Sequence, residues 1–151
     1  MMNTLNIDTP LGEMYLCAED STITALRFGR TEKDTPCEII YEAKRQLSEY
    51  FEGKRQEFDL PLAPKGTPFQ QAVWQALREI PYGETVSYGE IAAKVGNPKA
   101  SRAVGMANNR NPIAVIVPCH RVVGANGSLT GYAGGLDKKD FLLSLEHNNL
   151  K

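Results

Sequence analysis

The chain has few of the residues that build disulfide-rich or zinc-binding proteins. Its 151 residues include only two histidines and three cysteines, Cys17, Cys37 and Cys119. An odd number of cysteines at irregular spacing, with no CxxC pair, argues against a disulfide framework and offers no zinc cage. We therefore expect no metal site. In such a chain an isolated cysteine is reactive only where its neighbours make it so.

The chain also lacks long hydrophobic runs. No window approaches the roughly 18 to 20 consecutive apolar residues that a membrane-spanning helix needs. The first residues, Met1–Leu5, lack the basic-then-apolar pattern of an export signal. These absences predict a globular protein with no membrane partner. We expect it inside the cell, in the cytoplasm or, in a eukaryote, in the nucleus.

The net charge of −1 hides an asymmetry between two halves of the chain. Residues 1–62 hold 7 Lys+Arg against 12 Asp+Glu, whereas residues 63–151 hold 10 against 6. From Lys94 to Arg121 there are five basic residues and no acidic one. Such a segment indicates nucleic acid as a partner, although a solvated basic surface has the same composition.

The composition changes at a short segment with two prolines and a glycine, which interrupt any regular element. We predict a scaffold domain over residues 1–62 and a functional domain over residues 63–151. In the first domain, alternation at 13–18 and a β-rich run at 22–28 predict antiparallel strands. Apolar residues at helical spacing within 40–51 predict a helix beside them. This half carries no cluster of reactive side chains.

Two capping boxes open helices in the second half. Thr67-Pro68-Phe69-Gln70 and Ser87-Tyr88-Gly89-Glu90 each place a hydroxyl three residues before a Gln or Glu that can reach back to it. The second of these helices and a third at 98–109, joined through Gly96, form a helix-turn-helix, which is a DNA-binding motif or an ordinary helical hairpin. On the third helix we expect Ala100, Ala103, Val104 and Ala107 to be buried and Lys99, Arg102, Met106, Asn109 and Arg110 to face outward.

The β-branched run at 113–117 predicts a buried strand that ends at Pro118–Arg121. A cysteine becomes a nucleophile where a base takes its proton or a positive neighbour stabilises its thiolate. His120 and Arg121 follow Cys119 directly, so Cys119 is the candidate nucleophile. Adjacent side chains on a strand point to opposite faces, and a turn or a bridging water is therefore needed between thiol and imidazole.

The imidazole also needs a carboxylate to set its tautomer, and Glu146 is the best-placed candidate, at the end of a helix predicted from Asp137. His147 beside it is a competing partner, and a carboxylate at a helix end is often only solvated. Between the strand and this helix lies a Gly-rich loop at 124–135. Such a loop lets the backbone approach a flat ligand closely, or it is a plain surface loop.

Motifs in the second half occur together and in a fixed order. They are Ser87-Tyr88-Gly89-Glu90-Ile91-Ala92, Gly96-Asn97-Pro98-Lys99-Ala100-Ser101-Arg102-Ala103-Val104-Gly105, Asn111-Pro112-Ile113, Pro118-Cys119-His120-Arg121-Val122-Val123 and Gly131-Tyr132-Ala133-Gly134-Gly135-Leu136. With these motifs the chain resembles the O6-alkylguanine-DNA alkyltransferases, also called methylated-DNA–protein-cysteine methyltransferases. The resemblance is strong over residues 65–147 and weak before them.

The resemblance implies DNA repair by direct reversal. An alkyl group would pass from the O6 atom of guanine in double-stranded DNA to Cys119, stoichiometrically and irreversibly, after base flipping. O4-alkylthymine is a second candidate substrate. The resemblance implies no cofactor and a monomer that binds the minor groove. The implied fold is α+β: a small ribonuclease-H-like domain of antiparallel sheet plus helix, then a mostly helical domain with the helix-turn-helix and the active-site cysteine.

The same resemblance assigns roles to individual residues. His120 would reach the thiol through a water, Glu146 would orient His120, and Asn111 would tie the strand to the helix-turn-helix and help form the base pocket. Tyr88 would hydrogen-bond the flipped guanine and assist its departure, while Arg102 would enter the duplex where the base has left. The other residues expected at DNA or the base are Lys99, Ser101, Ala103, Arg110, Arg121, Tyr132, Ala133 and Gly134.

The chain departs from its relatives at Ala133, where some carry a serine, and this leaves the selectivity of the pocket open. The zinc-binding cysteines and histidines of some relatives are missing. One alternative is a lesion-binding damage sensor that transfers nothing, although such proteins replace the cysteine that is present here. Another is a cysteine hydrolase that uses Cys119, His120 and Glu146 on a small acyl substrate, which leaves Arg102 unexplained.

Overall fold

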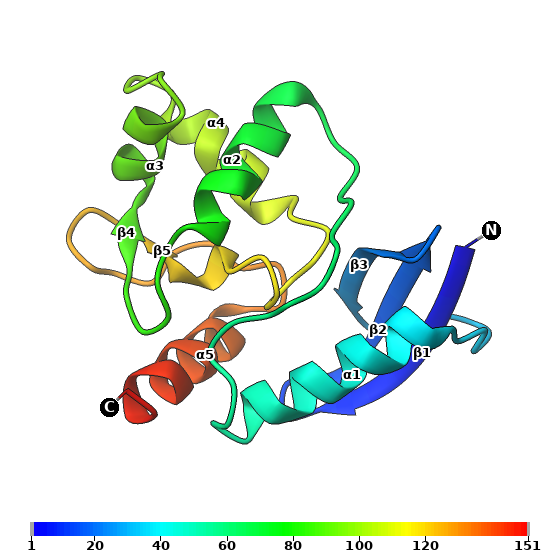
Figure 1. Ribbon diagram of the computed structural model, residues 1–151. Helices are drawn as coiled ribbons and strands as arrows, with labels where there is room; N and C mark the ends of the chain where they lie inside the picture. Colours follow the sequence, from blue (N-terminus) through cyan, green and yellow to red (C-terminus); the bar gives the residue numbers. More distant parts are fainter. Residues whose placement is uncertain (1, 151) are drawn as a thin grey trace. The chain divides into compact units, whose positions relative to one another are not determined.

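The computed structural model describes residues 2–150 (Figure 1). Contacts within the chain divide it into two units. The first comprises the chain through Lys65 together with Pro112–Ile116, and the second comprises Gly66–Asn111 and the chain from Val117 onward. Within the described range, every helix is too short or too polar to cross a membrane.

The first unit is a three-stranded antiparallel sheet with one helix packed on it (Figure 1). Strands β1 (Met2–Thr9), β2 (Gly12–Glu19) and β3 (Thr22–Phe28) pair in sequence order, and the helix is α1 (Glu38–Phe51). The two predicted strands and the helix are confirmed, whereas β1 goes unpredicted because few apolar residues mark its alternation. The core of this unit includes Leu5, Ile7, Met14, Leu16, Leu26, Ile40, Ala43, Leu47 and Tyr50.

The predicted strand at 113–117 is wrong. Ile113 makes a single parallel β-bridge with Leu26, and backbone hydrogen bonds of 2.9 and 3.1 Å lie on either side of Leu26. The chain then turns tightly at Val115, whose φ is +69° and around which the Ile116 N–H donates to the Ala114 carbonyl at 2.7 Å. A β-branched run indicates burial, and all of these residues are buried. Burial is compatible with a turn as well as with a strand.

The second unit is mostly helical, and both predicted capping boxes are present in it. Its elements are α2 (Pro68–Arg78), β4 (Val86–Ser87), α3 (Tyr88–Lys94), α4 (Ser101–Asn109), β5 (Val122–Val123) and α5 (Leu136–Asn148). Thr67 accepts from the Gln70 N–H at 3.1 Å and Ser87 from the Glu90 N–H at 3.1 Å, and the reciprocal bonds are also made. Strands β4 and β5 pair in parallel.

The rotation of α4 differs from the prediction. The Trp74 indole N–H donates to the Ala107 carbonyl at 2.8 Å and holds α4 against α2. In this orientation Val104, Ala107 and Asn108 are buried and Ala103 is exposed. The predicted burial of Ala103 is therefore wrong, because the polar Asn108 takes an interior position. The residues predicted to face outward are all exposed: Lys99, Arg102, Met106, Asn109 and Arg110.

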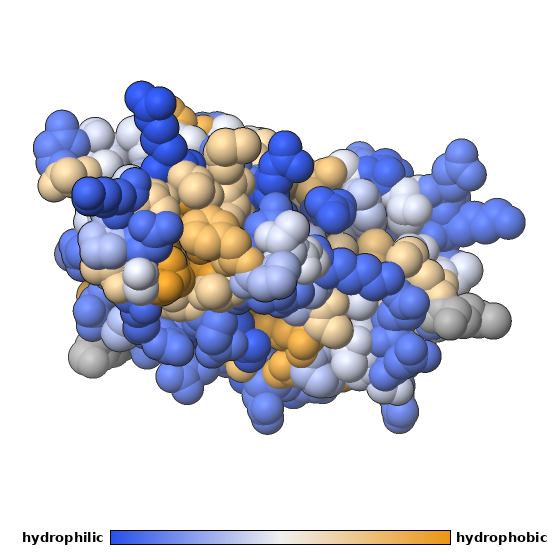
Figure 2. Space-filling model, turned by 90° about the horizontal axis from the view of Figure 1, so that it is seen from above, coloured by the Kyte–Doolittle hydropathy of each residue, from blue (hydrophilic) through white to orange (hydrophobic). Residues whose placement is uncertain are grey.

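The face shown in Figure 2 is hydrophilic around its rim and has hydrophobic patches toward its centre. Exposed apolar side chains include Tyr41 on α1, Leu136 and Phe141 on α5, and Met106 on α4. Isolated apolar side chains on a polar surface are normal and need no partner. Met106, at 62% exposure, differs from the others in lying between Arg102 and Arg110 along the outward side of α4.

Candidate active site

The candidate nucleophile lies at a sharp change of chain direction. Pro118 (φ −82°, ψ 64°) forms an inverse γ-turn, in which the Cys119 N–H donates to the Val117 carbonyl at 2.8 Å. Cys119 then opens a 3-10 turn, Cys119–Arg121. The Asn108 amide donates to the Cys119 carbonyl at 3.3 Å. These bonds fix the backbone that carries the thiol.

The Cys119 side chain is almost completely enclosed, with the residue 6% exposed. Burial raises the pKa of the thiol to about 11, although a hydrogen bond with Asn111 and the charge of Lys139 act to lower it. The Asn111 amide is itself held, since it donates to the Val117 carbonyl at 2.8 Å. At neutral pH the thiol is therefore almost entirely protonated. Any reaction of the sulfur near pH 7 needs a base to take the proton.

His120 and Glu146 form a buried pair that can supply this base. His120 Nε2 lies 2.7 Å from Glu146 Oε2, and neither side chain has exposed surface. Burial lowers the pKa of His120, and the Glu146 carboxylate offsets this only in part. The ring is therefore neutral, with Nε2–H donating to the carboxylate and a lone pair on Nδ1. Among the described residues, Nδ1 has no hydrogen-bond partner.

Arg121 balances the charge of Glu146. Its Nε and Nη2 atoms donate to the two carboxylate oxygens at 2.8 and 2.9 Å, and the Gly83 N–H donates at 3.2 Å. Gly83 has a φ of +81°, a conformation that favours glycine. Burial opposes ionisation of Glu146, but the hydrogen bonds from His120 and Arg121 outweigh it and hold the pKa of the carboxyl well below its ordinary value. Glu146 is thus a fixed anion beside a neutral imidazole.

Lys139 is a buried cation that the sequence analysis does not single out. Its side chain is fully enclosed, and its Nζ atom donates to the Val122 carbonyl at 2.5 Å and to the Thr130 carbonyl at 2.6 Å. Burial lowers the pKa of this ammonium group. A pattern that could have identified it is its place with Leu142 and Glu146 at helical spacing on the buried side of α5. Lys139 ties the Gly-rich loop to β5.

The Gly-rich loop also reaches Tyr88 at the start of α3. The Tyr88 hydroxyl donates to the Thr130 carbonyl at 3.1 Å and accepts from the Thr130 hydroxyl at 3.0 Å. On the same loop the hydroxyl of Tyr132 is buried, and this burial raises its pKa well above the ordinary value. Gly131 has a φ of +45°, and an added Cβ atom would lie 3.2 Å from Asn109 Oδ1. A larger residue at Gly131 is therefore strained by its backbone conformation, and the Asn109 side chain would have to shift to make room for it.

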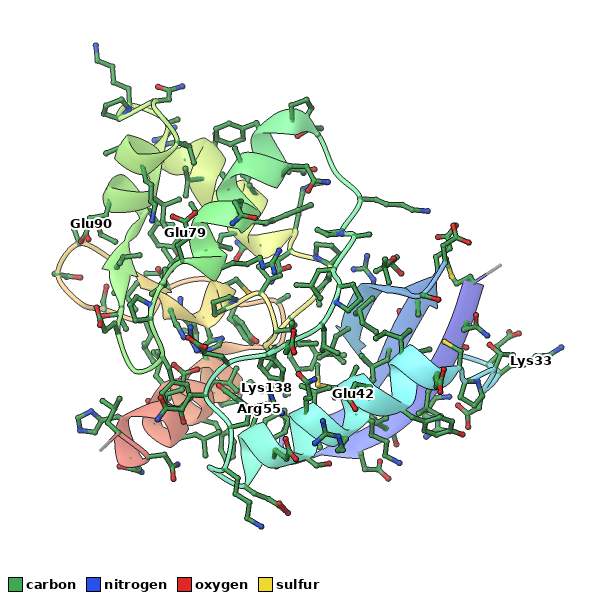
Figure 3. The ribbon with its side chains drawn as sticks, in the orientation of Figure 1. Lys33, Glu42, Arg55, Glu79, Glu90 and Lys138 are labelled. Atoms are coloured by element: carbon green, nitrogen blue, oxygen red, sulfur yellow. The ribbon has the colours of Figure 1, made fainter. Side chains whose placement is uncertain are left out.

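The basic residues between Lys94 and Arg121 do not form one surface. Lys94 is paired with Glu79, which Figure 3 labels, at 2.5 Å. Arg121 is only 7% exposed and is held by Glu146. The guanidinium of Arg121 is committed to the interior, and contact between Arg121 and DNA stays a prediction. The basic residues that remain exposed on and beside α4 are Lys99, Arg102 and Arg110.

The structure brings Cys119, His120, Glu146 and Asn111 together in one cluster. It does not join the thiol to the imidazole directly, because none of the hydrogen bonds among the described residues connects them. Of the other expected base contacts, Ser101 and Gly134 are half-buried, and Ala103 and Ala133 are exposed. Within residues 2–150, no group of His, Cys, Asp and Glu side chains is arranged to hold a metal ion.

A buried thiol, a neutral imidazole with an accepting nitrogen, and a carboxylate that stabilises the protonated ring form a nucleophile, a base and an orienting group. A cluster of this kind generates a sulfur nucleophile at neutral pH where a proton path joins the thiol to the imidazole. Two residues that bond the cluster are not predicted from the sequence: Gly83, which donates to Glu146, and Asn108, which donates to the Cys119 carbonyl. Three more that hold α4 and the Gly-rich loop are also not predicted: Trp74, Thr130 and Lys139.

Comparisons with known proteins extend over both units. The model of the 6-O-methylguanine DNA methyltransferase ribonuclease-like domain matches residues 4–64, and that of the DNA binding domain matches residues 68–148. The methylated-DNA–protein-cysteine methyltransferase of Methanosarcina acetivorans is 56% identical over 147 residues, which cover 92% of this chain and 94% of the relative. The constitutive one of Bacillus subtilis is 51% identical over 158 residues, covering 95% of this chain and 94% of the relative.

Solved structures have the same fold. The crystal structure of Mycobacterium tuberculosis O6-methylguanine methyltransferase aligns with a TM-score of 0.90 and 49% identity, over 100% of this chain and 96% of that one. A crystal structure of Mycobacterium tuberculosis OGT in complex with DNA aligns with a TM-score of 0.89 and 52% identity, over 97% and 93%. The α+β fold expected from the sequence is confirmed. By both domain models and by these identities, the chain belongs to the 6-O-methylguanine DNA methyltransferases, the family of methylated-DNA–protein-cysteine methyltransferases.

Proposed function

We propose that this chain repairs DNA by taking the alkyl group of O6-alkylguanine onto Cys119, once per molecule. The observation that carries the proposal is the enclosed thiol at the start of the 3-10 turn, hydrogen-bonded by Asn111 and followed by the His120–Glu146 pair. The other cysteines belong to the first unit: Cys17 lies in β2, and Cys37 precedes α1.

The transfer begins with removal of the thiol proton, because a thiol with a pKa of about 11 is a poor nucleophile near pH 7. His120 Nδ1 accepts this proton through a bridging water. The Nε2–H group keeps its hydrogen bond to Glu146, and the carboxylate stabilises the imidazolium that forms. The sulfur attacks the alkyl carbon, the S–C bond forms, and the C–O6 bond breaks. Its electron pair passes to guanine, which takes up a proton from solvent while the imidazolium of His120 returns the thiol proton to solvent.

The product on the protein is a thioether. A thioether carbon has no easy leaving path in water, so the reaction is irreversible and each molecule reacts once. The proposed scheme uses side chains of this chain and water, and it requires no cofactor. Tyr88 donates a hydrogen bond that offsets the charge on the departing base, and Tyr132, Ala133 and Gly134 line the pocket that receives the base.

The outward side of α4 suits the minor groove of double-stranded DNA. The exposed side chains of Lys99, Arg102 and Arg110 supply positive charge for phosphates and groove edges. Small residues, Ser101 and Ala103 among them, keep this side of the helix slim. Because the O6 atom is inside the duplex, the base is flipped out, at a cost of about a few kcal/mol. Arg102 then occupies the vacated place.

The two parts of the chain have separate tasks in this proposal. Residues 1–62 act as a scaffold, and residues 63–151 carry DNA binding and alkyl transfer. The protein works as a monomer, since the nucleophile, the base and the orienting carboxylate all belong to one unit of one chain. O4-alkylthymine is a second substrate to test, because its alkylated oxygen offers the same kind of carbon to the sulfur.

The test is intact mass, followed by peptide mapping, after mixing the protein with a duplex that carries a single O6-methylguanine. We expect one methyl group per molecule on the Cys119 peptide and restored guanine in the DNA. Cys119→Ala abolishes transfer and still binds DNA, and Cys37→Ala, the matched control, transfers normally. A second duplex with O4-methylthymine measures the substrate range.

Two other outcomes would replace this proposal. A protein that binds the lesion tightly but gains no methyl group is a damage sensor. Repeated turnover of a small acyl ester, lost in Cys119→Ala and indifferent to DNA, would identify a cysteine hydrolase.

A further inference from the structure

The contact between Tyr88 and Thr130 joins the helix-turn-helix to the Gly-rich loop. It has two hydrogen bonds: the Tyr88 hydroxyl donates to the Thr130 carbonyl at 3.1 Å, and the Thr130 hydroxyl donates to the Tyr88 oxygen at 3.0 Å. Both groups are at least partly open to solvent. Water could therefore hydrogen-bond each hydroxyl without the other. The two hydrogen bonds between Tyr88 and Thr130 instead fix the orientation of the Tyr88 phenol.

The Thr130 carbonyl has a second donor. The buried ammonium of Lys139 lies 2.6 Å from the same oxygen and 2.5 Å from the Val122 carbonyl. If the Tyr88 proton turns elsewhere, the Thr130 carbonyl keeps a charge-assisted hydrogen bond from Lys139. The phenol proton is thus available to a ligand without leaving an acceptor unsatisfied. The hydrogen bond from the Thr130 hydroxyl to the phenol oxygen is retained in that state.

We propose that Thr130 is a positioning residue for alkyl transfer, acting through Tyr88. This inference rests on the proposed function, in which Tyr88 donates to the departing guanine. When the C–O6 bond breaks, its electron pair adds negative charge to the base, and the Tyr88 O–H turns from the Thr130 carbonyl to the base. The Thr130 hydroxyl holds the phenol oxygen throughout. A hydroxyl that accepts a hydrogen bond donates a stronger one, because chains of hydrogen bonds polarise one another.

Thr130→Val tests this, because valine keeps the shape of threonine and removes its hydroxyl. The measurement is the single-turnover rate of methyl transfer at saturating DNA, with the DNA concentration for half-maximal rate measured separately. We expect Thr130→Val to slow transfer about fivefold, the value of one neutral hydrogen bond, and to leave the half-saturating concentration unchanged. Thr130→Ser restores the hydroxyl and the rate. Thr85→Val, an exposed threonine of the same unit, reacts like the wild type.

A double-mutant cycle with Tyr88→Phe shows whether Thr130 acts through Tyr88. In the Tyr88→Phe background, Thr130→Val should cause no further loss of rate. An equal loss in both backgrounds, or a failure of Thr130→Ser to restore the rate, overturns the role of Thr130. If Tyr88→Phe itself transfers at the wild-type rate, the inference fails while transfer to Cys119 stands. If the wild type gains no methyl group at Cys119, the proposed function fails as well.

Discussion

Glu146 holds a negative charge where its side chain has no exposed surface, and that charge depends on the donors around it. Glutamine at this position would leave the Arg121 guanidinium buried opposite a neutral amide. Removing one partner of a buried ion pair costs about 3–5 kcal/mol. We expect Glu146→Gln to lower the free energy of unfolding by that amount in urea denaturation at pH 7. Glu32→Gln, at an exposed position outside the helices and strands, is the control and should change it little.

The pH dependence of stability has a definite sign at the same carboxylate. The pKa of Glu146 in the folded protein lies well below its ordinary value of 4.5, so the unfolded chain takes up the proton first as the pH falls. This stability is present above pH 4.5 and is lost below it. His120, whose pKa is lowered from 6.5, acts in the same direction. We expect the difference between wild type and Glu146→Gln to shrink from about pH 5 to about pH 3. A constant difference would contradict the assigned charge.

Whereas Glu146 is held in its charged form, the Cys119 thiol is held in its neutral form, and this gives a further prediction. With a pKa of about 11, the thiolate fraction should grow tenfold with each pH unit below that value. Carbamidomethylation of the Cys119 peptide by iodoacetamide, followed by mass spectrometry, should therefore accelerate about tenfold per unit from about pH 8 to about pH 10. A rate that levels off below about pH 9 would mean that the folded protein stabilises the thiolate.

At the scale of elements, we expect α4 to set how binding to DNA depends on salt. Three basic side chains are exposed on and beside it, Lys99, Arg102 and Arg110. Each neutralised phosphate of duplex DNA contributes about 0.9 to the slope of log affinity against log salt. We therefore expect a slope of about −3 in a fluorescence-anisotropy titration with undamaged duplex. Lys94 and Arg121 should add little, because they are engaged with Glu79 and Glu146.

Single substitutions separate this prediction from a general charge effect. Lys99→Ala should reduce the magnitude of the salt slope by about one. Lys33→Ala removes the same charge from the first unit, at a residue labelled in Figure 3, and should leave the slope unchanged. Equal changes in the two variants would show that overall charge, and not the α4 surface, controls binding.

Elements with local determinants are the ones that sequence predicts well here. The two capping boxes satisfy their helix ends within four residues, and both are found as predicted. The prediction of a strand at 113–117 is wrong because an apolar run indicates burial only. The conformation of this segment depends on a distant partner, Leu26. The rotation of α4 fails for a similar reason. It depends on the indole of Trp74, which reaches a carbonyl 33 positions away in the chain.

The candidate site divides along the same line. Cys119 and His120 are recognisable because they are adjacent in sequence and follow an apolar run. Glu146 is predicted only as the best-placed carboxylate, with His147 as a competitor, since 26 residues separate it from His120. Lys139 and Thr130 are not found at all, because their partners are backbone carbonyls and a distant phenol. Every residue has a backbone carbonyl, so the sequence does not indicate which carbonyl accepts a hydrogen bond.

At the scale of the whole molecule, the two units are interleaved in sequence. The chain leaves the second unit after Asn111, contributes Pro112–Ile116 to the first, and rejoins the second at Val117. Inside the second unit, the Asn111 amide donates to the Val117 carbonyl at 2.8 Å. This bond holds together the two residues that flank the segment Pro112–Ile116, next to Cys119. The segment that positions the nucleophile is thus part of the architecture of both units.

Cutting the chain after Lys65 should therefore not release the first unit as a separate body. The segment Pro112–Ile116 lies in the second piece. Its Ile113 pairs with Leu26 of the first piece, next to backbone hydrogen bonds of 2.9 and 3.1 Å. Ile113 and Val115 are also almost fully buried and would be exposed to water on separation. With a protease site inserted between Lys65 and Gly66, we expect the cleaved pieces to elute together in gel filtration and to keep methyl transfer. Separate elution of two folded pieces would show that the segment Pro112–Ile116 contributes little to the stability of the first unit.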